Sequence, residues 1–300
     1  MSITTPGPDD LDAVIDLIVA EQSDVSRGTG YLGTTRDGIV DELGDLNPDW
    51  RTTLRVAGED GRVVGAVVWD IDTELGRSWI FGPWVSGDEG AWSRWAPELV
   101  AAAIDSLAEL SPAITDIELC GDVANQRLAA LGADLGLKAS EVNHVLVVDT
   151  AIAEGWPGDD ARLRGVRADD VERLRPLHDA EFPRSYYTAE RVVADGLAGE
   201  FVVVVAEQEG EFLGYASGRV QADGEGYLDF VAVPIEARGR GVGLGLVVGA
   251  SRRIMALSPK GTVNLTVRED RLAARGLYAR LGFRPDGSIV GYRSDVGADG

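Results

Sequence analysis

The chain has 300 residues, 45% of them hydrophobic and 26% charged, which is enough to fill two packed domains of about 150 residues each. Its formal net charge of −22 repels nucleic acid and anionic membranes, and no apolar stretch approaches the ~18 residues of a membrane helix. The single cysteine, Cys120, excludes a disulfide within the chain and a cysteine-based zinc site, and neither His144 nor His178 has a partner at metal-binding spacing. We therefore expect a cytoplasmic protein without a metal, a nucleic-acid partner or a membrane partner.

The acidity is concentrated in the first half of the chain. Residues 1–150 hold 27 acidic and 9 basic side chains, whereas residues 151–300 hold 23 and 19. Such a charge attracts cationic molecules, but a surface that only keeps the protein in solution would have the same composition. Both interpretations remain open at this point.

Hydrophobic periodicity predicts two helices, three strands, then helix, strand, helix and strand in the first half. The expected helices cover 5–21, 36–43, 89–110 and 123–135, and the expected strands cover 52–57, 63–71, 78–85, 114–119 and 142–148. Residues 151–160 contain two glycines and a proline and are expected to form a linker. The predicted domains are therefore 1–150 and 151–300.

A similar order of elements returns in the second half, with one additional strand at its start. The expected strands cover 162–166, 201–207, 212–220, 227–233, 262–267 and 289–292, and the expected helices cover 171–182, 189–197, 241–257 and 271–281. Local matches at offsets of 149, 148 and 146 residues support a repeated domain: Val63-Val64-Gly65 with Phe212-Leu213-Gly214, Val85 with Val233, and Leu135-Gly136-Leu137 with Leu281-Gly282-Phe283.

A glycine-rich junction connects the 227–233 strand to the 241–257 helix, with the sequence Arg238-Gly239-Arg240-Gly241-Val242-Gly243-Leu244-Gly245. Unpaired N–H groups and the dipole at a helix start favour an anion, and glycines let a pyrophosphate reach the backbone. Two commoner phosphate loops, Gly-x-x-x-x-Gly-Lys-Ser/Thr and Gly-x-Gly-x-x-Gly, are absent. Gly241, Gly245 and Gly249 share one helical face, and each mid-helix glycine costs ~1 kcal/mol relative to alanine, so we expect a group packed closely there.

The remaining pattern, Arg238-x-x-Gly241-x-Gly243, resembles the coenzyme A pyrophosphate loop of the GNAT superfamily of acyl-CoA N-acyltransferases. Downstream, Leu277-Tyr278-Ala279-Arg280-Leu281-Gly282-Phe283 is similar to the tyrosine-bearing helix of that family and the Leu-Gly-Phe that closes it. The resemblance implies an α/β (α+β) fold of tandem GNAT domains, each a mixed, mostly antiparallel sheet flanked by helices. It also implies acetyl-CoA as the cosubstrate.

The resemblance further implies a set of coenzyme-binding residues. Phosphate contacts are expected from Arg238, Gly239, Arg240, Gly241 and Gly243, and backbone pairing with pantetheine is expected from Phe230, Val231 and Val233 in a gap between splayed strands. Arg271 occupies a position where the family often has an asparagine that contacts pantetheine, and an arginine there could bind a phosphate instead.

Two residues are candidates for the chemistry. An alkylammonium with a pKa of ~10.4 must lose a proton before its nitrogen can attack a thioester, and Asp229 lies nine residues before Arg238, where many family members carry a catalytic glutamate. Asp229 is therefore the candidate base, directly or through water, although an ion pair with a neighbouring arginine is the alternative. By periodicity alone Tyr278 is a core tyrosine. The resemblance makes it the candidate proton donor to the leaving thiolate.

The first domain repeats the elements but not this chemistry. The same offsets give the matching positions in the first domain. The places of Arg238, Gly241 and Gly243 are taken by Gly90, Ser93 and Trp95. The places of Asp229 and Tyr278 are taken by Phe81 and Gly132. An indole where the backbone should meet pyrophosphate would block it. The first domain therefore resembles a degenerate GNAT copy without a coenzyme loop.

The resulting hypothesis is an acetyl-CoA-dependent N-acetyltransferase that acts on the primary amine of a small-molecule acceptor. The acceptor is expected to be cationic if the acidic charge serves binding. The alternative is a non-catalytic module that binds acyl-CoA. The sequence predicts no particular oligomeric state.

Overall fold

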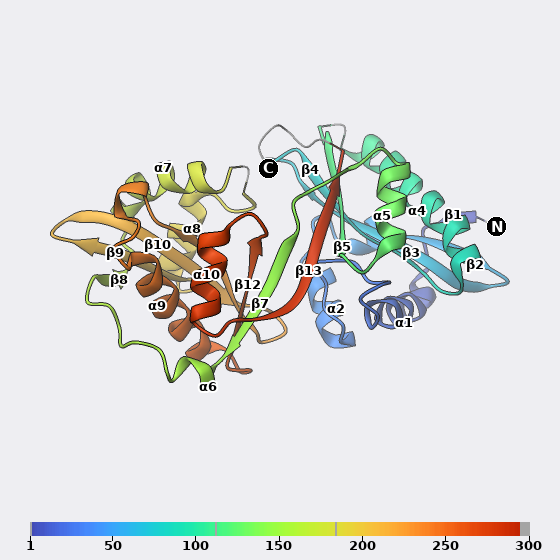
Figure 1. Ribbon diagram of the computed structural model, residues 1–300. Helices are drawn as coiled ribbons and strands as arrows, with labels where there is room; N and C mark the ends of the chain where they lie inside the picture. The colour runs from blue at the N-terminus through green and yellow to red at the C-terminus, as the bar shows by residue number, and fades with distance from the viewer. Residues whose placement is uncertain (1, 112, 184, 295–300) are drawn as a thin grey trace. The chain divides into compact units, whose positions relative to one another are not determined.

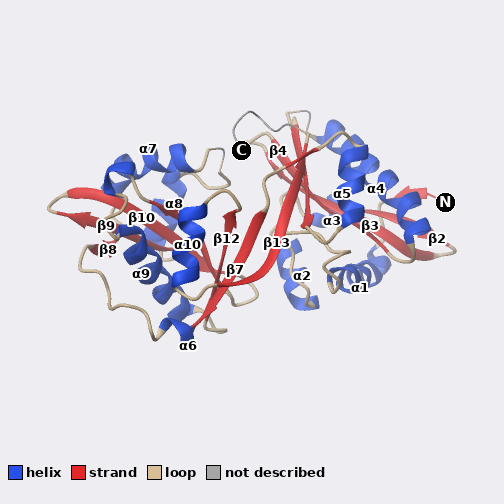
Figure 2. Cartoon of the chain, in the orientation of Figure 1, coloured by secondary structure: helices blue, strands red, loops and turns tan. Residues whose placement is uncertain are grey.

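The computed structural model describes residues 2–111, 113–183 and 185–294 of the chain. They form two units (Figure 1). The first runs to Val142 and takes up the chain again from Ser288, and the second is Asn143–Gly287. Each unit has helices on both faces of its sheet (Figure 2).

The first unit contains a sheet in the order β1-β2-β3-β4-β5-β13, in which only the β4–β5 pair is parallel. Helices α4 and α5 cover one face of this sheet, and α1, α2 and α3 cover the other. The elements are β1 (Ser2–Thr4), η1 (Pro8–Asp10), α1 (Leu11–Gln22), α2 (Arg36–Gly44), α3 (Trp50–Thr53), β2 (Arg55–Glu59), β3 (Arg62–Asp72), β4 (Arg77–Val85), α4 (Glu89–Leu110), β5 (Asp116–Asp122), α5 (Gln126–Asp134) and β6 (Lys138–Ala139).

The second unit contains a sheet in the order β8-β9-β10-β11-β12-β7, in which only the β11–β12 pair is parallel. Helices α9, α10 and α6 pack on one face, and α7 and α8 pack on the other (Figure 1). The elements are β7 (Asn143–Asp149), α6 (Thr150–Ala153), β8 (Leu163–Gly165), η2 (Ala168–Asp170), α7 (Val171–Glu181), α8 (Ala189–Ala198), β9 (Val202–Gln208), β10 (Glu211–Val220), β11 (Gly226–Ala232), η3 (Ile235–Ala237), α9 (Val242–Leu257), β12 (Thr262–Arg268) and α10 (Leu272–Arg280). The last strand, β13 (Arg284–Arg293), begins in the second unit and continues into the sheet of the first.

The two halves of the chain exchange their last strands. β7, expected to complete the first domain, pairs along its whole length with β12. The end of β13, from Ile289 to Arg293, pairs with β5. The observed division therefore differs from the predicted domains, 1–150 and 151–300, because an alternating pattern identifies a strand but not the strand beside which it lies.

The segment expected to be a linker, 151–160, is packed into the second unit. Trp156 is buried, its ring stacks on Phe283 at 6.1 Å between centroids, and its indole N–H donates to the carbonyl of Leu281 at 2.7 Å. Two other boundaries differ from those expected. The first helix, expected from residue 5, begins at Leu11 after a 3-10 turn. The strand expected from residue 52 is helical through Thr53. None of the helices in the described ranges combines the length and the apolar character needed to span a membrane.

Candidate active site

A β-bulge in β11 places Asp229 on the sheet. Ser217 of β10 lies opposite Phe230 and Gly218 lies opposite Leu228, so Asp229 is an extra residue without a partner across the ladder. A bulge of this kind bends the strand and re-aims the side chain of the extra residue. Asp229 and Phe230 accordingly both contact Tyr186, which lies in the segment between α7 and α8.

The ladder between β11 and β12 ends just before the bulge. Gly226 pairs with Val263 and Tyr227 with Asn264, and within the described residues no pair follows, although β11 runs to Ala232 and β12 to Arg268. The facing backbone edges of the two strands are therefore open over the stretch that contains Phe230 and Val231 and leads to Val233. Splayed strands were expected at this place, and that expectation is confirmed.

Asp229 is a buried carboxylate with one free oxygen. Its side chain is 0% exposed; Oδ1 accepts a hydrogen bond from the Tyr186 hydroxyl at 2.8 Å and lies 3.9 Å from Nη2 of Arg219, whereas Oδ2 has no partner among the described residues. Burial raises the pKa of Asp229 to about 6, against the opposing effects of Arg219 and Tyr186. The ion pair anticipated as the alternative exists, but it is long and leaves Oδ2 unengaged.

His178 anchors the segment that carries Tyr186. It is 1% exposed, and its Nε2 lies 2.7 Å from the carbonyl oxygen of Tyr187. Because a carbonyl can only accept, Nε2 carries the proton and Nδ1 accepts from the Tyr215 hydroxyl. Burial lowers the pKa of His178, so the neutral ring is favoured. His178 therefore has a structural role in the hydrophobic core.

Tyr278 is a buried phenol. It lies on α10 against Phe283, with ring centroids 5.4 Å apart. Burial raises its pKa to about 12. The Tyr227 phenol donates a hydrogen bond to Thr266 of β12 at 3.0 Å.

The glycine-rich junction has the backbone of an anion-binding loop. Gly239 and Gly241 have φ of +74° and +77°, a left-handed conformation that other residues adopt only with strain. The first bond of α9 runs from the Gly245 N–H to the Gly241 carbonyl at 3.1 Å, so the N–H groups of the preceding turn have no acceptor within the helix. A Cβ on Gly243 would approach no atom closer than 3.8 Å, so the backbone there is unobstructed.

The three arginines expected to bind phosphate do not share one environment. Arg238 and Arg271 both contact the carboxylate of Glu181, whereas Arg240 lies 3.7 Å from Glu211 of β10. Arg238 also donates from Nε to the carbonyl of Val233 at 2.9 Å, which ties it to the end of β11. The structure therefore brings Arg238 and Arg271 together and leaves Arg240 apart.

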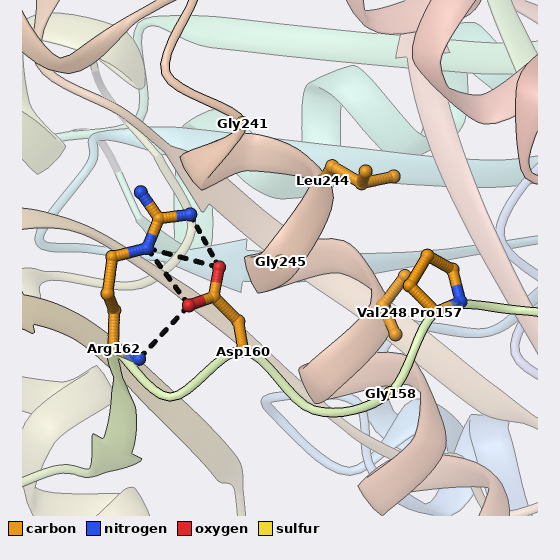
Figure 3. A pocket seen from close by; sticks show the side chains of 8 residues that line it. All are labelled: Pro157, Gly158, Asp160, Arg162, Gly241, Leu244, Gly245 and Val248. Carbon is orange, nitrogen blue, oxygen red and sulfur yellow. Dashed lines mark hydrogen bonds and ion pairs between the residues drawn. The ribbon is translucent and has the colours of Figure 1, made fainter.

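Close packing against the glycine face of α9 was expected, and it is found at two of the three glycines. A Cβ on Gly245 would lie 2.5 Å from the Asp160 carboxylate, and one on Gly249 would lie 2.4 Å from Leu163. Asp160 holds Arg162, which donates to the carbonyl of Arg240 at 3.2 Å (Figure 3). The 157–162 segment and the start of α9 enclose a pocket of about 270 Å³.

The offset of 148 residues fails at the helix start: α4 begins at Glu89 after the N-cap Asp88, and α9 begins at Val242 after the N-cap Gly241, so Asp88 rather than Ser93 stands at the place of Gly241. Of the residues at the expected places, Gly90 and Ser93 are exposed, whereas Trp95 and Gly132 are buried. Trp95 is 5% exposed, and a Cβ on Gly132 would meet the Tyr292 ring at 2.9 Å. The first turn of α4 is capped by Asp88, whose carboxylate accepts from the N–H of Ala91 at 3.0 Å. An acidic cap at this position opposes a second anion.

The first unit also fills its own opening between parallel strands. The β4–β5 ladder ends at Ile80 and Leu119, one residue before Cys120. The carbonyl of Cys120 then accepts from the N–H of Gly30 and from the Thr29 hydroxyl, both at 2.8 Å. The segment after α1 thus occupies this edge of β5. The corresponding strand of the second unit is β12, and no segment of the described chain occupies its edge in this way.

Sequence reasoning missed Tyr186, Arg219 and Glu181. Arg219 follows Ser217 by two residues in β10. Because side chains alternate between the two faces of a strand, this spacing could have placed Arg219 on the same face of the sheet as Asp229. Tyr186 and Glu181 had no such signal, because a loop and a helix end carry no periodicity.

Comparison with known proteins bears on both units. Residues 171–283 match the model of the acetyltransferase (GNAT) family. A comparison with curated proteins gave no match.

Three solved structures share the fold of nearly the whole chain. A GCN5-related N-acetyltransferase from Sphaerobacter thermophilus is 18% identical with a TM-score of 0.73, and the alignment covers 98% of this chain and 95% of that one. A tandem GNAT protein from the clavulanic acid biosynthesis pathway is 17% identical with a TM-score of 0.65, over 100% and 99% of the two chains. A glucosamine N-acetyltransferase region of a fungal multi-domain β-N-acetylglucosaminidase is 18% identical with a TM-score of 0.69, over 97% of this chain and 38% of that one.

The family match covers most of the second unit, and the structural likeness extends the same fold to the first. The second unit is thus a domain of the GNAT acetyltransferase family, and the chain has the fold of a tandem GNAT protein.

Proposed function

We propose that the second unit is an acetyl-CoA-dependent N-acetyltransferase that acetylates the primary amine of a small acceptor. The observation that carries this proposal is Asp229, a buried carboxylate with a free Oδ2 at a bulge beside the open edges of β11 and β12. Members of the GNAT family are N-acetyltransferases that use acetyl-CoA. The left-handed glycines, the uncapped turn of α9 and the buried phenol of Tyr278 fit that cosubstrate.

Asp229 is proposed to accept the proton of the acceptor's ammonium group at Oδ2. With a pKa of about 6, roughly ten carboxylates are ionised at pH 7 for each one that is protonated. A group that titrates near the working pH is also the most effective general base. Tyr186 and Arg219 hold Oδ1, so the base keeps one orientation.

Tyr278 is proposed to donate a hydrogen bond from its hydroxyl to the leaving sulfur. When bound, acetyl-CoA supplies the acetyl group and a thiolate leaving group. A full proton transfer from a phenol of pKa about 12 to a thiolate whose conjugate acid has a pKa of ~8.5 is unfavourable by about 5 kcal/mol. Hydrogen bonding by Tyr278 is therefore the expected contribution, and the thiolate takes up the second proton, which the attacking nitrogen loses as the amide forms.

The first unit is proposed to bind no coenzyme, because the 28–30 segment occupies its opening on β5 and the Asp88 carboxylate caps the start of α4. The acceptor is proposed to be cationic on the grounds of the acidic composition, and the protein is proposed to act in the cytoplasm. Salt dependence tests the acceptor class. The kcat/KM for a polyamine should fall steeply between 0.1 and 1 M salt, where the Debye length falls from ~10 Å to ~3 Å, and that for a neutral amino acid should not. Equal, shallow dependence would contradict a cationic acceptor.

The deciding experiment for the activity is a thiol-release assay with acetyl-CoA and a panel of polyamines, aminoglycosides, amino acids and peptide N-termini. We expect at least one amine to raise thiol release far above hydrolysis in water, and the Asp229→Asn variant to lose that increase. Coenzyme A binding without acceptor-dependent release for any amine would instead favour the non-catalytic acyl-CoA-binding module.

A further inference from the structure

Glu181 is the one acidic side chain among the described residues that contacts two of the arginines assigned to the coenzyme. Its Oε1 makes a short contact with Nη2 of Arg238, and its Oε2 lies 3.6 Å from Nη1 of Arg271. The two arginine side chains are each 49% exposed, whereas the Glu181 side chain is 23% exposed. One carboxylate therefore bridges two partly exposed guanidinium groups.

The position of Glu181 is unfavourable without these partners. It is the last residue of α7, and a negative charge at a helix C-terminus opposes the helix dipole. The arginines offset this cost. Guanidinium groups bind carboxylates and phosphates through the same planar set of donors, so a phosphate that binds Arg238 at Nη2 or Arg271 at Nη1 competes there with Glu181.

We propose that Glu181 is an internal anion that competes with the coenzyme's phosphates for Arg238 and Arg271 and thereby sets the affinity for coenzyme A. This inference rests on the proposed function, since it assigns the ligand to the same loop. Glu181 holds the two arginines beside each other, and a coenzyme phosphate that takes up the same donors weakens these ion pairs.

The test is titration calorimetry of the Glu181→Gln variant with coenzyme A. Glutamine keeps the size of the side chain and removes its charge. Since exposed ion pairs are individually weak, we expect the variant to bind coenzyme A about 2- to 10-fold more tightly than the wild type at low salt. The two affinities should converge toward 1 M salt, where the Debye length is ~3 Å.

The matched control is Glu172→Gln, the same change on the same helix. Glu172 pairs with Arg175 at 3.9 Å, is 75% exposed and contacts neither coenzyme arginine, so its substitution should leave the affinity unchanged. Thermal unfolding of both variants should match the wild type. Equal or weaker binding by Glu181→Gln would contradict the competition and give Glu181 a supporting role instead. A wild-type protein that binds no coenzyme A would contradict the proposed function itself, and this inference with it.

Discussion

Asp229 combines burial, a raised pKa and a free oxygen, and these three properties have a common origin in the bulge. Because only the ionised form can accept a proton, kcat/KM should rise with pH and level off above an apparent pKa of about 6. The Asp229→Asn variant should lose ~10²–10⁴ in kcat/KM and the corresponding limb of the pH profile. Steady-state kinetics from pH 5 to 9 measure both. A variant with the wild-type profile would remove Asp229 from the mechanism.

A stability measurement on the same variant separates lost chemistry from lost structure. The pKa of Asp229 is raised in the folded state, so its contribution to stability is largest below its unfolded pKa of ~3.9 and is lost as the pH rises through about 6. Asp229→Asn should therefore increase the free energy of unfolding at pH 7 by about 1–3 kcal/mol and change it little at pH 4. Urea titrations of the wild type and the variant at pH 4 and pH 7 measure these free energies of unfolding. A variant that is less stable at pH 7 would show that ionised Asp229 supports the fold.

Tyr278→Phe removes the hydroxyl and keeps the ring that packs on Phe283. Stability and coenzyme affinity should therefore change little, while loss of the hydrogen bond to the leaving sulfur lowers kcat by ~10²–10³. Rapid kinetics with the best amine and calorimetry with coenzyme A separate the two effects. An unchanged kcat for Tyr278→Phe would show that Tyr278 has only a structural role.

The site residues that could be predicted from the sequence are those that a motif or a spacing between residues identifies. Asp229 followed from its distance to Arg238, and Tyr278 followed from the Leu-Tyr-x-x-Leu-Gly-Phe pattern. Tyr186 and Glu181 could not be found in this way, because each acts through a contact between separate elements that only the folded chain determines. The same holds for the free Oδ2 of Asp229, which depends on every neighbour of that oxygen.

At the scale of elements, the helices and strands around the site were predicted within a few residues, whereas their partners were not. Hydrophobic alternation and helix-capping residues depend only on residues close in sequence, so they predict helices and strands without knowledge of the tertiary contacts. The choice of β12 as the partner of β7, and the early end of the β11–β12 ladder, depend on competition between many strands of similar pattern. The bulge at Asp229 likewise leaves no trace in hydrophobic periodicity.

Two glycines test how the 157–162 segment holds the start of α9. Alanine is favoured over glycine by ~1 kcal/mol in a helix, but a Cβ on Gly245 would lie 2.5 Å from Asp160, which Arg162 holds in place. Overpacking of this kind costs about 1–3 kcal/mol, so Gly245→Ala should lower the free energy of unfolding. Gly276 of α10 is the matched control, because a Cβ there meets nothing within 4 Å, and Gly276→Ala should raise stability by about 0.5–1 kcal/mol. Chemical denaturation compares the two, and a stabilised Gly245→Ala would contradict the close packing.

At the scale of the whole molecule, the chain uses one fold twice and keeps the features of a coenzyme site once. Both units have a single parallel strand pair that opens toward a helix N-terminus. In the second unit that opening leads to left-handed glycines and an uncapped turn. In the first unit it is met by the 28–30 segment, and the helix that follows begins with a carboxylate cap.

The measurement that tests this account most directly is the stoichiometry of coenzyme A binding by titration calorimetry. We predict one coenzyme A per chain, because only the second unit has an open loop. Gly241→Glu should abolish binding, since the new side chain places a negative charge at the phosphate position and strains a residue with φ of +77°. A control substitution in the first unit, Ser93→Glu on the exposed side of α4, should leave binding unchanged. Two equivalent sites per chain, or a single site lost on Ser93→Glu and kept on Gly241→Glu, would contradict the account.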